Sequence, residues 1–179
     1  ALLLGIYLES PARLHADIRL PKVLSDHMVL QQTLPLVVWG QADPGESVKV
    51  SFREQEAATK ADATGRWRVL LAPMAAGGPF EMAVSGKNNL KLQDILVGEV
   101  WICSGQSNME WPMSRVNNAE QEIAAANFPG IRLFSVKHEV ADTPQEDLTG
   151  EWIVSTPENI KDFSAVGYFF ARDLNRKLN

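Results

Sequence analysis

A serine with the surroundings of a nucleophile lies in the segment from Gly98 to Met113, which is GEVWICSGQSNMEWPM. The apolar residues 100–103 predict a strand buried on both faces of a sheet. The small polar residues that follow predict a sharp turn, in which Gly105 permits the chain to reverse. This turn would hold the hydroxyl of Ser107 at the rim of the sheet. A serine placed there could attack a carbonyl carbon while its own N–H faces the developing oxyanion.

Spacing alone leaves an ordinary alternative open for this serine. Gly-Gln-Ser is a common tripeptide, and most serines that follow strands only cap helices. The segment also differs from the G-x-S-x-G nucleophile elbow, because Met109 stands where that motif has its second glycine.

Composition excludes several other classes of protein. The 179 residues include 17 Lys and Arg against 22 Asp and Glu, a net charge of −5, so nucleic acid is not an expected partner. The single cysteine, Cys103, excludes an internal disulfide framework and a cysteine-based zinc site, and we expect it in the core. No apolar run approaches the roughly 20 residues that span a bilayer, so no membrane partner is expected. Dinucleotide, P-loop and metal-ligand motifs are missing, and we expect neither a metal nor an organic cofactor.

The first 16 residues are typical of a signal-peptide remnant. The apolar octet ALLLGIYL is followed by the helix-breaking Pro11 and the small Ala16, which predicts cleavage before Asp17. We therefore expect export to the periplasm, the extracellular space or the lysosome. The alternative is a mobile apolar tail on a cytosolic domain.

Residues 17–93 are predicted to form a β-sandwich. Apolar and polar residues alternate in short runs such as 48–52 and 67–71, the pattern of half-buried strands. Turn signals rich in Gly and Pro separate the runs at intervals of roughly 8–12 residues, as in sandwich folds. Trp39 and Trp67 are interpreted as core anchors, with a sugar-stacking role as the alternative for either.

Residues 94–179 show the alternating pattern of an α/β domain. The strand before the serine is followed by a predicted helix over 119–126, a strand over 131–136 and a final helix capped by Ser164. The polar stretch 141–162, which Trp152 interrupts, is predicted to be a long loop or a small excursion. This order indicates a parallel sheet, and two strands with two helices cannot cover both of its faces. The pattern favours the truncated first half of a larger domain, with a small α/β appendage as the alternative.

The run VWICSGQSNMEWPM resembles the nucleophile block of the sialate O-acetylesterase family, a branch of the SGNH hydrolases. The upstream segments LPKVLSDHMVLQQ, PLVVWGQADPGE and ADATGRWRV are similar to the N-terminal β-domain of that family, so the resemblance extends from Ile18 to the end. It implies a β-sandwich followed by the first half of a flavodoxin-like SGNH hydrolase domain. It also implies a serine esterase that removes acetyl groups from sugars, with O-acetylated sialic acid or another acetylated glycan as substrate.

Transferred residue by residue, the resemblance assigns Ser107 as the nucleophile and its N–H as one oxyanion donor. The N–H of Gly167, at the start of the last helix, is the candidate for a second donor. Three neighbours of the serine are expected to support the turn: Gly105, Gln106 and Asn108. Trp111 is a candidate for substrate binding.

A serine nucleophile also needs a general base, which this family takes from an Asp-x-x-His-like segment near the C-terminal end of the hydrolase domain. The chain has three histidines, His15 in the signal-like segment, His27 and His138. The last two fit ordinary surface or turn positions. We therefore expect the chain alone to lack a complete triad and to be inactive. The alternatives are a non-catalytic carbohydrate-binding or adhesive β-sandwich protein, or an acetyl xylan esterase of the same superfamily.

Overall fold

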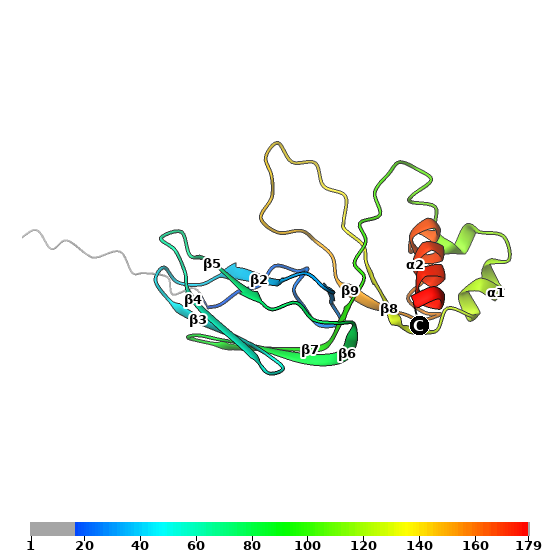
Figure 1. Ribbon diagram of the computed structural model, residues 1–179. Coiled ribbons are helices and arrows are strands. Elements are labelled where there is room, and N and C mark those ends of the chain that lie inside the picture. The colour runs from blue at the N-terminus through cyan, green and yellow to red at the C-terminus, as the bar shows by residue number, and fades with distance from the viewer. Residues whose placement is uncertain (1–16, 179) are drawn as a thin grey trace, which may run out of the picture.

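The computed structural model describes residues 17–178, in which β-strands predominate and helices are few (Figure 1). The strands of the first part are β1 (Val29–Gln31), β2 (Leu36–Gln41), β3 (Ser47–Phe52), β4 (Gln55–Lys60), β5 (Arg66–Leu71), β6 (Gly77–Ser85) and β7 (Asn89–Gly98). They form a five-stranded sheet in the order β1-β7-β6-β3-β4 and a two-stranded sheet of β2 and β5. The signal-like segment 1–16, including His15, lies outside the described residues, so export stays a prediction.

The two sheets share one hydrophobic core. Inward and outward positions alternate along β3 and β5, as the period of the sequence predicts. Trp67 on β5 is buried, which confirms its role as a core anchor. The same prediction for Trp39 is wrong, because this residue is 38% exposed. Leu36 and Val38 occupy the inward positions of β2, so Trp39 points to the opposite face.

Gly40, also on β2, faces the core where no side chain fits. An added Cβ would collide with the carbonyl oxygen of Arg19 and lie 2.9 Å from Cζ2 of Trp67. Gly40→Ala is therefore expected to lower the free energy of unfolding by about 1–3 kcal/mol, measured by urea unfolding with circular dichroism. Gly98→Ala is the matched control, because its Cβ would lie 3.6 Å from Cγ1 of Val29, an ordinary contact. Equal losses in both variants would contradict this steric explanation.

The second part contains the short helix η1 (Met113–Arg115), α1 (Ala119–Ala124), β8 (Phe128–Phe134), β9 (Trp152–Ser155) and α2 (Ala165–Leu178). These elements lie at one end of strands β1–β7 (Figure 1). The helix after Ser164 and the helix near residue 119 are confirmed. No helix within residues 17–178 is both long and apolar enough to cross a membrane.

The strands of this second part differ from their predicted arrangement. The sequence pattern predicts a parallel sheet, whereas β8 and β9 pair in antiparallel orientation. β9 arises within the stretch 141–162 that the sequence presents as a loop. Its first residue, Trp152, packs against Phe134 of β8 with ring centroids 5.2 Å apart, and its indole N–H donates to the carbonyl of Val23 at 2.9 Å. These tertiary contacts stabilise a strand in an otherwise polar stretch.

Residues 100–103 do not form the buried strand that their apolar character predicts. Trp101 is 58% exposed and Ile102 is 93% exposed. Cys103 is also exposed, so its predicted place in the core is wrong. A strand needs neighbours for its backbone N–H and C=O groups, and no strand among residues 17–178 pairs with this segment. Trp101 instead makes an edge-to-face contact with Phe170 of α2, at 5.2 Å between ring centroids.

The last strand of the first part, β7, continues through residues 93 and 94, where the hydrophobic pattern of the sequence changes and the pairing with β6 shifts its register. Ile95 and Val97 beyond that point are buried in the shared core of the two sheets. The change of pattern therefore falls inside a strand.

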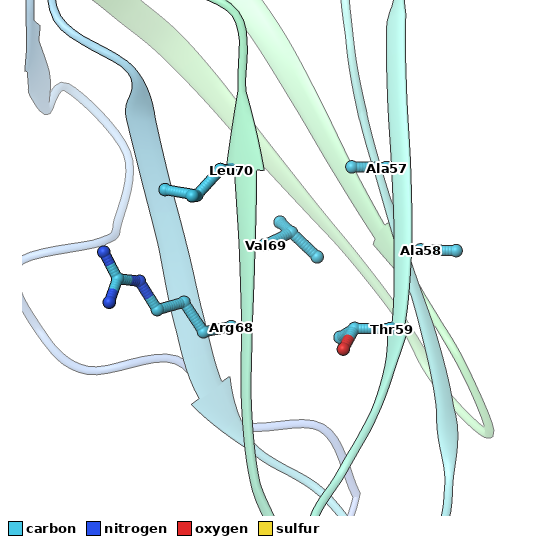
Figure 2. Close-up of a pocket in the computed structure, with 6 residues that line it drawn as sticks. All are labelled: Ala57, Ala58, Thr59, Arg68, Val69 and Leu70. Carbon is cyan, nitrogen blue, oxygen red and sulfur yellow. The ribbon is translucent and has the colours of Figure 1, made fainter.

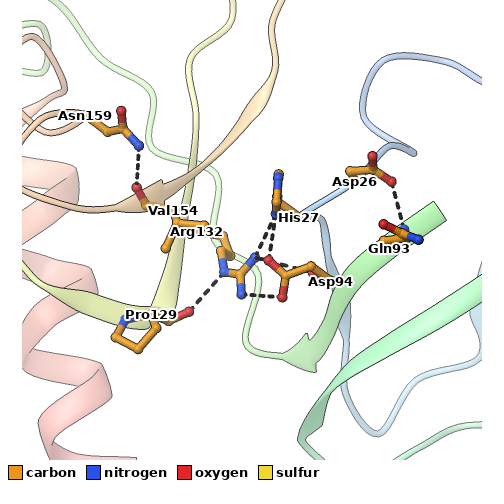
Figure 3. Close-up of polar contacts among 8 residues, drawn as sticks. All are labelled: Asp26, His27, Gln93, Asp94, Pro129, Arg132, Val154 and Asn159. Carbon is orange, nitrogen blue, oxygen red and sulfur yellow. Dashed lines mark hydrogen bonds and ion pairs between the residues drawn. The ribbon is translucent and has the colours of Figure 1, made fainter.

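An ion pair connects this strand with the second part (Figure 3). The guanidinium of Arg132 on β8, whose side chain is 5% exposed, donates to both carboxylate oxygens of Asp94 at 2.6 and 2.9 Å. Its Nε donates to the carbonyl of Pro129 at 3.0 Å. Nδ1 of His27 lies 2.6 Å from the same carboxylate. The hydrogen bonds from Arg132 and then from His27 hold the pKa of Asp94 at about 2, below its usual 3.8.

Candidate functional site

Ser107 lies in an exposed turn, as expected for a nucleophile that must meet a substrate. The N–H of Met109 donates to the carbonyl of Gln106 at 2.8 Å, and the N–H of Trp111 donates to the carbonyl of Asn108 at 3.4 Å. Residues 104–108 are all exposed. Backbone hydrogen bonds thus close the turn and leave the serine at the surface.

Gly105, Gln106 and Asn108 are the residues expected to support the turn. Gly105 does not adopt a left-handed backbone conformation. A Cβ at this position would lie 3.2 Å from Cβ of Met109, so this glycine permits a close approach of the chain to the methionine. The side chains of Gln106 and Asn108 make no hydrogen bond within the described residues, and the bonds that they contribute come from their carbonyls. Their bracing roles stay predictions.

Gly167, the candidate second oxyanion donor, is buried in the first turn of α2. Its N–H donates to the hydroxyl of Ser164 at 3.2 Å, as in an ordinary helix N-cap. Binding an oxyanion would therefore require this N–H to exchange Ser164 for the substrate. The oxyanion role of Gly167 stays a prediction, and it requires the Gly167 N–H to leave the Ser164 hydroxyl.

The tertiary structure brings the serine turn and the start of α2 together. Three backbone hydrogen bonds join residues 111–114 to residues 161–165: Ala165 N–H to Trp111 O at 2.8 Å, Ser114 N–H to Lys161 O at 2.9 Å and Met113 N–H to Phe163 O at 3.1 Å. Beneath them, Met113, Ile160 and Tyr168 are fully buried. The segments that carry the two predicted parts of the site are thus joined at one junction.

Trp111 presents its ring at this junction. The side chain is 48% exposed, and its indole N–H donates to the carbonyl of Arg115 at 3.1 Å. This hydrogen bond holds the indole ring in one orientation, and part of the ring stays exposed. An exposed aromatic ring of fixed orientation is a suitable surface for the apolar face of a sugar.

Neither described histidine is bound to the serine. His138 lies beside Glu110, with Nδ1 3.2 Å from the carboxylate oxygen, and both side chains are exposed. His27 contacts Asp94 in the ion-pair network already described. Within residues 17–178, no histidine makes a hydrogen bond to Ser107, so these residues contain no assembled Ser-His pair. The sequence offers no signal for the pairing of Glu110 with His138.

Neither a metal-binding cluster nor the hollow between β4 and β5 offers a competing catalytic site in the described residues. No group of three or more His, Cys, Asp and Glu side chains among residues 17–178 could hold a metal ion. A hollow of about 380 Å³ lies between β4 and β5, and Figure 2 shows the residues that line it. It is lined by Ala57, Ala58, Thr59, Arg68, Val69 and Leu70. Because this lining has no carboxylate and no imidazole, it cannot supply acid–base chemistry near neutral pH.

Comparison with known proteins points to one kind of enzyme. The chain is 34% identical to the human sialate O-acetylesterase over 200 residues, which cover 97% of this chain and 38% of that protein. It is also 34% identical to the mouse sialate O-acetylesterase over 177 residues, covering 87% of this chain and 33% of that protein. No family model matches the chain.

A solved structure agrees with these relatives. The crystal structure of a carbohydrate acetylesterase from Xanthomonas citri superposes with a TM-score of 0.87 at 45% sequence identity, covering 89% of this chain and 38% of that chain. The mostly β fold described above therefore matches that of a carbohydrate acetylesterase. The chain spans less than two fifths of the length of these proteins.

Proposed function

Since the chain belongs to the sialate O-acetylesterase family, we propose that it is part of a carbohydrate O-acetylesterase with Ser107 as its nucleophile. The observation that carries this assignment is the position of Ser107, at the surface of a closed turn that is hydrogen-bonded to the start of α2. The finer description of the fold, a β-sandwich followed by the first half of an SGNH hydrolase domain, belongs to the same proposal.

The proposed reaction proceeds through an acetyl-enzyme. The Ser107 oxygen attacks the acetyl carbonyl carbon and transfers its proton to a general base. The N–H of Ser107, and that of Gly167 once it has left Ser164, stabilise the negative oxygen of the tetrahedral intermediate. Collapse of the intermediate breaks the bond to the sugar oxygen, which takes the proton from the base. Water then attacks the acetyl-serine and releases acetate, which restores the hydroxyl.

The general base of this reaction would come from outside the chain. His27 is engaged with Asp94, and His138 is engaged with Glu110. The relatives are more than twice as long as the segment matched here, which leaves room for a histidine and an aspartate beyond it. The chain alone would accordingly be inactive. The exposed segment 100–103 would become a strand inside a sheet when strands from beyond the matched segment pair with it on both sides.

The substrate class follows from the same relatives. We propose an acetylated glycan, with O-acetylated sialic acid first and acetylated xylan as the alternative. Export, which rests only on residues 1–16, fits a substrate that lies outside the cell. A non-catalytic glycan-binding protein is the rival function.

The deciding experiment measures acetate release by the full-length polypeptide that contains this chain. O-acetylated sialic acid, acetylated xylan and an aryl acetate are offered in parallel. Release from the sialic acid supports the proposal, and release from xylan alone would move the substrate to the plant polysaccharides. Absence of hydrolysis, with binding of glycans by the polypeptide in calorimetry, would establish the rival function.

Trp111 provides a test of the substrate surface. Trp111→Ala is expected to raise KM for the glycan by about three- to tenfold, the equivalent of one lost ring contact, with a smaller change in kcat. Trp111→Phe keeps a ring and should recover most of the affinity. The aryl acetate serves as control, because it has no sugar ring to stack. An equal rise of KM for both esters would contradict a sugar-binding role.

A further inference from the structure

The hydroxyl of Ser164 connects the candidate nucleophile to the start of α2. It donates to Sδ of Met109 at 3.5 Å and accepts the N–H of Gly167 at 3.2 Å. A serine hydroxyl has one proton and two lone pairs, so both interactions are satisfied at once. The spacing of the sequence predicts only the bond between the Gly167 N–H and Ser164. It does not predict the contact with Met109, because Met109 and Ser164 lie 55 positions apart.

Met109 in turn holds the turn that carries Ser107. Its N–H donates to the carbonyl of Gln106 at 2.8 Å, and its Cβ lies close to Gly105, where an added Cβ would be 3.2 Å away. Residues 104–108 are all exposed, whereas Met109 is half-buried. Within the described residues, the contact of the Met109 side chain with Ser164 is therefore the point nearest to Ser107 at which the turn is joined to the rest of the fold.

From these contacts we propose that Ser164 is a positioning residue, which sets the place of Ser107 through Met109 while its lone pair holds the N–H of Gly167. The inference rests on the proposed function, because it concerns the same nucleophile. Ser164 does not touch the reacting atoms in this arrangement. It acts by fixing the turn, and a small displacement of a reacting atom is enough to slow a reaction strongly.

A spectroscopic cycle on the chain itself tests the connection without requiring activity. The amide resonances of Ser107 and Gly167 are compared in the wild type, Ser164→Ala, Met109→Leu and the double variant. Loss of the hydroxyl should shift both resonances, and the shift of Ser107 should disappear when Ser164→Ala is introduced into the Met109→Leu background. A serine that only caps α2 would shift Gly167 and leave Ser107 in place. That result would overturn the proposal.

Kinetics in the full-length polypeptide provide the second measurement. Ser164→Ala is expected to lower kcat about tenfold with little change in KM, and Ser164→Thr, which keeps the hydroxyl, should restore most of the rate. Ser114→Ala, at an exposed position in the adjoining segment, is the matched control and should be neutral. If Ser164→Ala does not fold, Ser164→Gly replaces it, because glycine is tolerated at a helix N-cap.

The outcomes separate this inference from the proposed function. A full-length polypeptide that releases no acetate from any ester removes the esterase assignment, and the amide cycle still decides whether Ser164 positions the turn. An active enzyme whose kcat and Ser107 resonance are both unchanged in Ser164→Ala would overturn the positioning role alone.

Discussion

Ser107→Ala is expected to reduce acetate release by the full-length polypeptide by at least about 10³-fold, because the reaction proposed here passes through an acetyl-serine at this residue. KM should change little, since loss of the hydroxyl leaves the residues proposed to bind the sugar in place. Residual hydrolysis would come from the oxyanion donors alone. The measurement is kcat on O-acetylated sialic acid, together with labelling by a serine-reactive phosphonate, which the variant should no longer show.

Ser104→Ala is the matched control for this prediction. Ser104 lies three positions before the proposed nucleophile and is equally exposed in the same segment. It should retain wild-type turnover and phosphonate labelling. Wild-type turnover in Ser107→Ala, or loss of activity in Ser104→Ala instead, would show that the nucleophile is misassigned.

Asp94→Asn is expected to have the largest effect on stability, because it leaves the guanidinium of Arg132 without its counter-charge. The Arg132 side chain is 5% exposed and donates two hydrogen bonds to this carboxylate. Removing one partner of a buried pair commonly costs about 3–5 kcal/mol; Asp94 is 32% exposed, so we expect about 2–3 kcal/mol here. Asparagine suits the position because φ of Asp94 is +54°, a conformation that most side chains disfavour.

The same carboxylate predicts an acid dependence with a defined sign. The hydrogen bonds from Arg132 and His27 lower the folded-state pKa of Asp94 to about 2, against an ordinary value of 3.8. A group with a lowered pKa stabilises the folded state fully above its unfolded-state value and loses that contribution as the pH falls through the folded-state value. Stability from Asp94 should therefore decline between about pH 4 and pH 2, by about 1–2 kcal/mol after allowance for its partial exposure.

Urea unfolding at several pH values checks both statements about Asp94. The wild type and Asp94→Asn should differ most near neutral pH and converge as the pH approaches 2. Glu56→Gln, which removes an exposed ion pair with Lys49, is the control and should change the unfolding midpoint much less. A difference between wild type and Asp94→Asn that stays constant down to pH 2 would contradict the role given to the ion pair.

The sequence by itself determined the features that depend on neighbouring residues. Alternation along the strands identified the inward position of Trp67, because a strand turns successive side chains to opposite faces. The pattern after Ser164 located α2, because helix caps and helical periods are local. The family of the chain was also recognisable, since the block around Ser107 is one continuous run of residues.

Only the tertiary structure decided which distant residues meet. The apolar segment 100–103 has the composition of a buried strand, but burial requires neighbours that no local pattern specifies. The partner of Arg132 and the pairing of β8 with β9 likewise depend on residues brought together by folding. The contact between Ser164 and Met109 has the same origin. Hydrogen bonds and ion pairs act over a few ångströms, and the fold alone determines which atoms come that close.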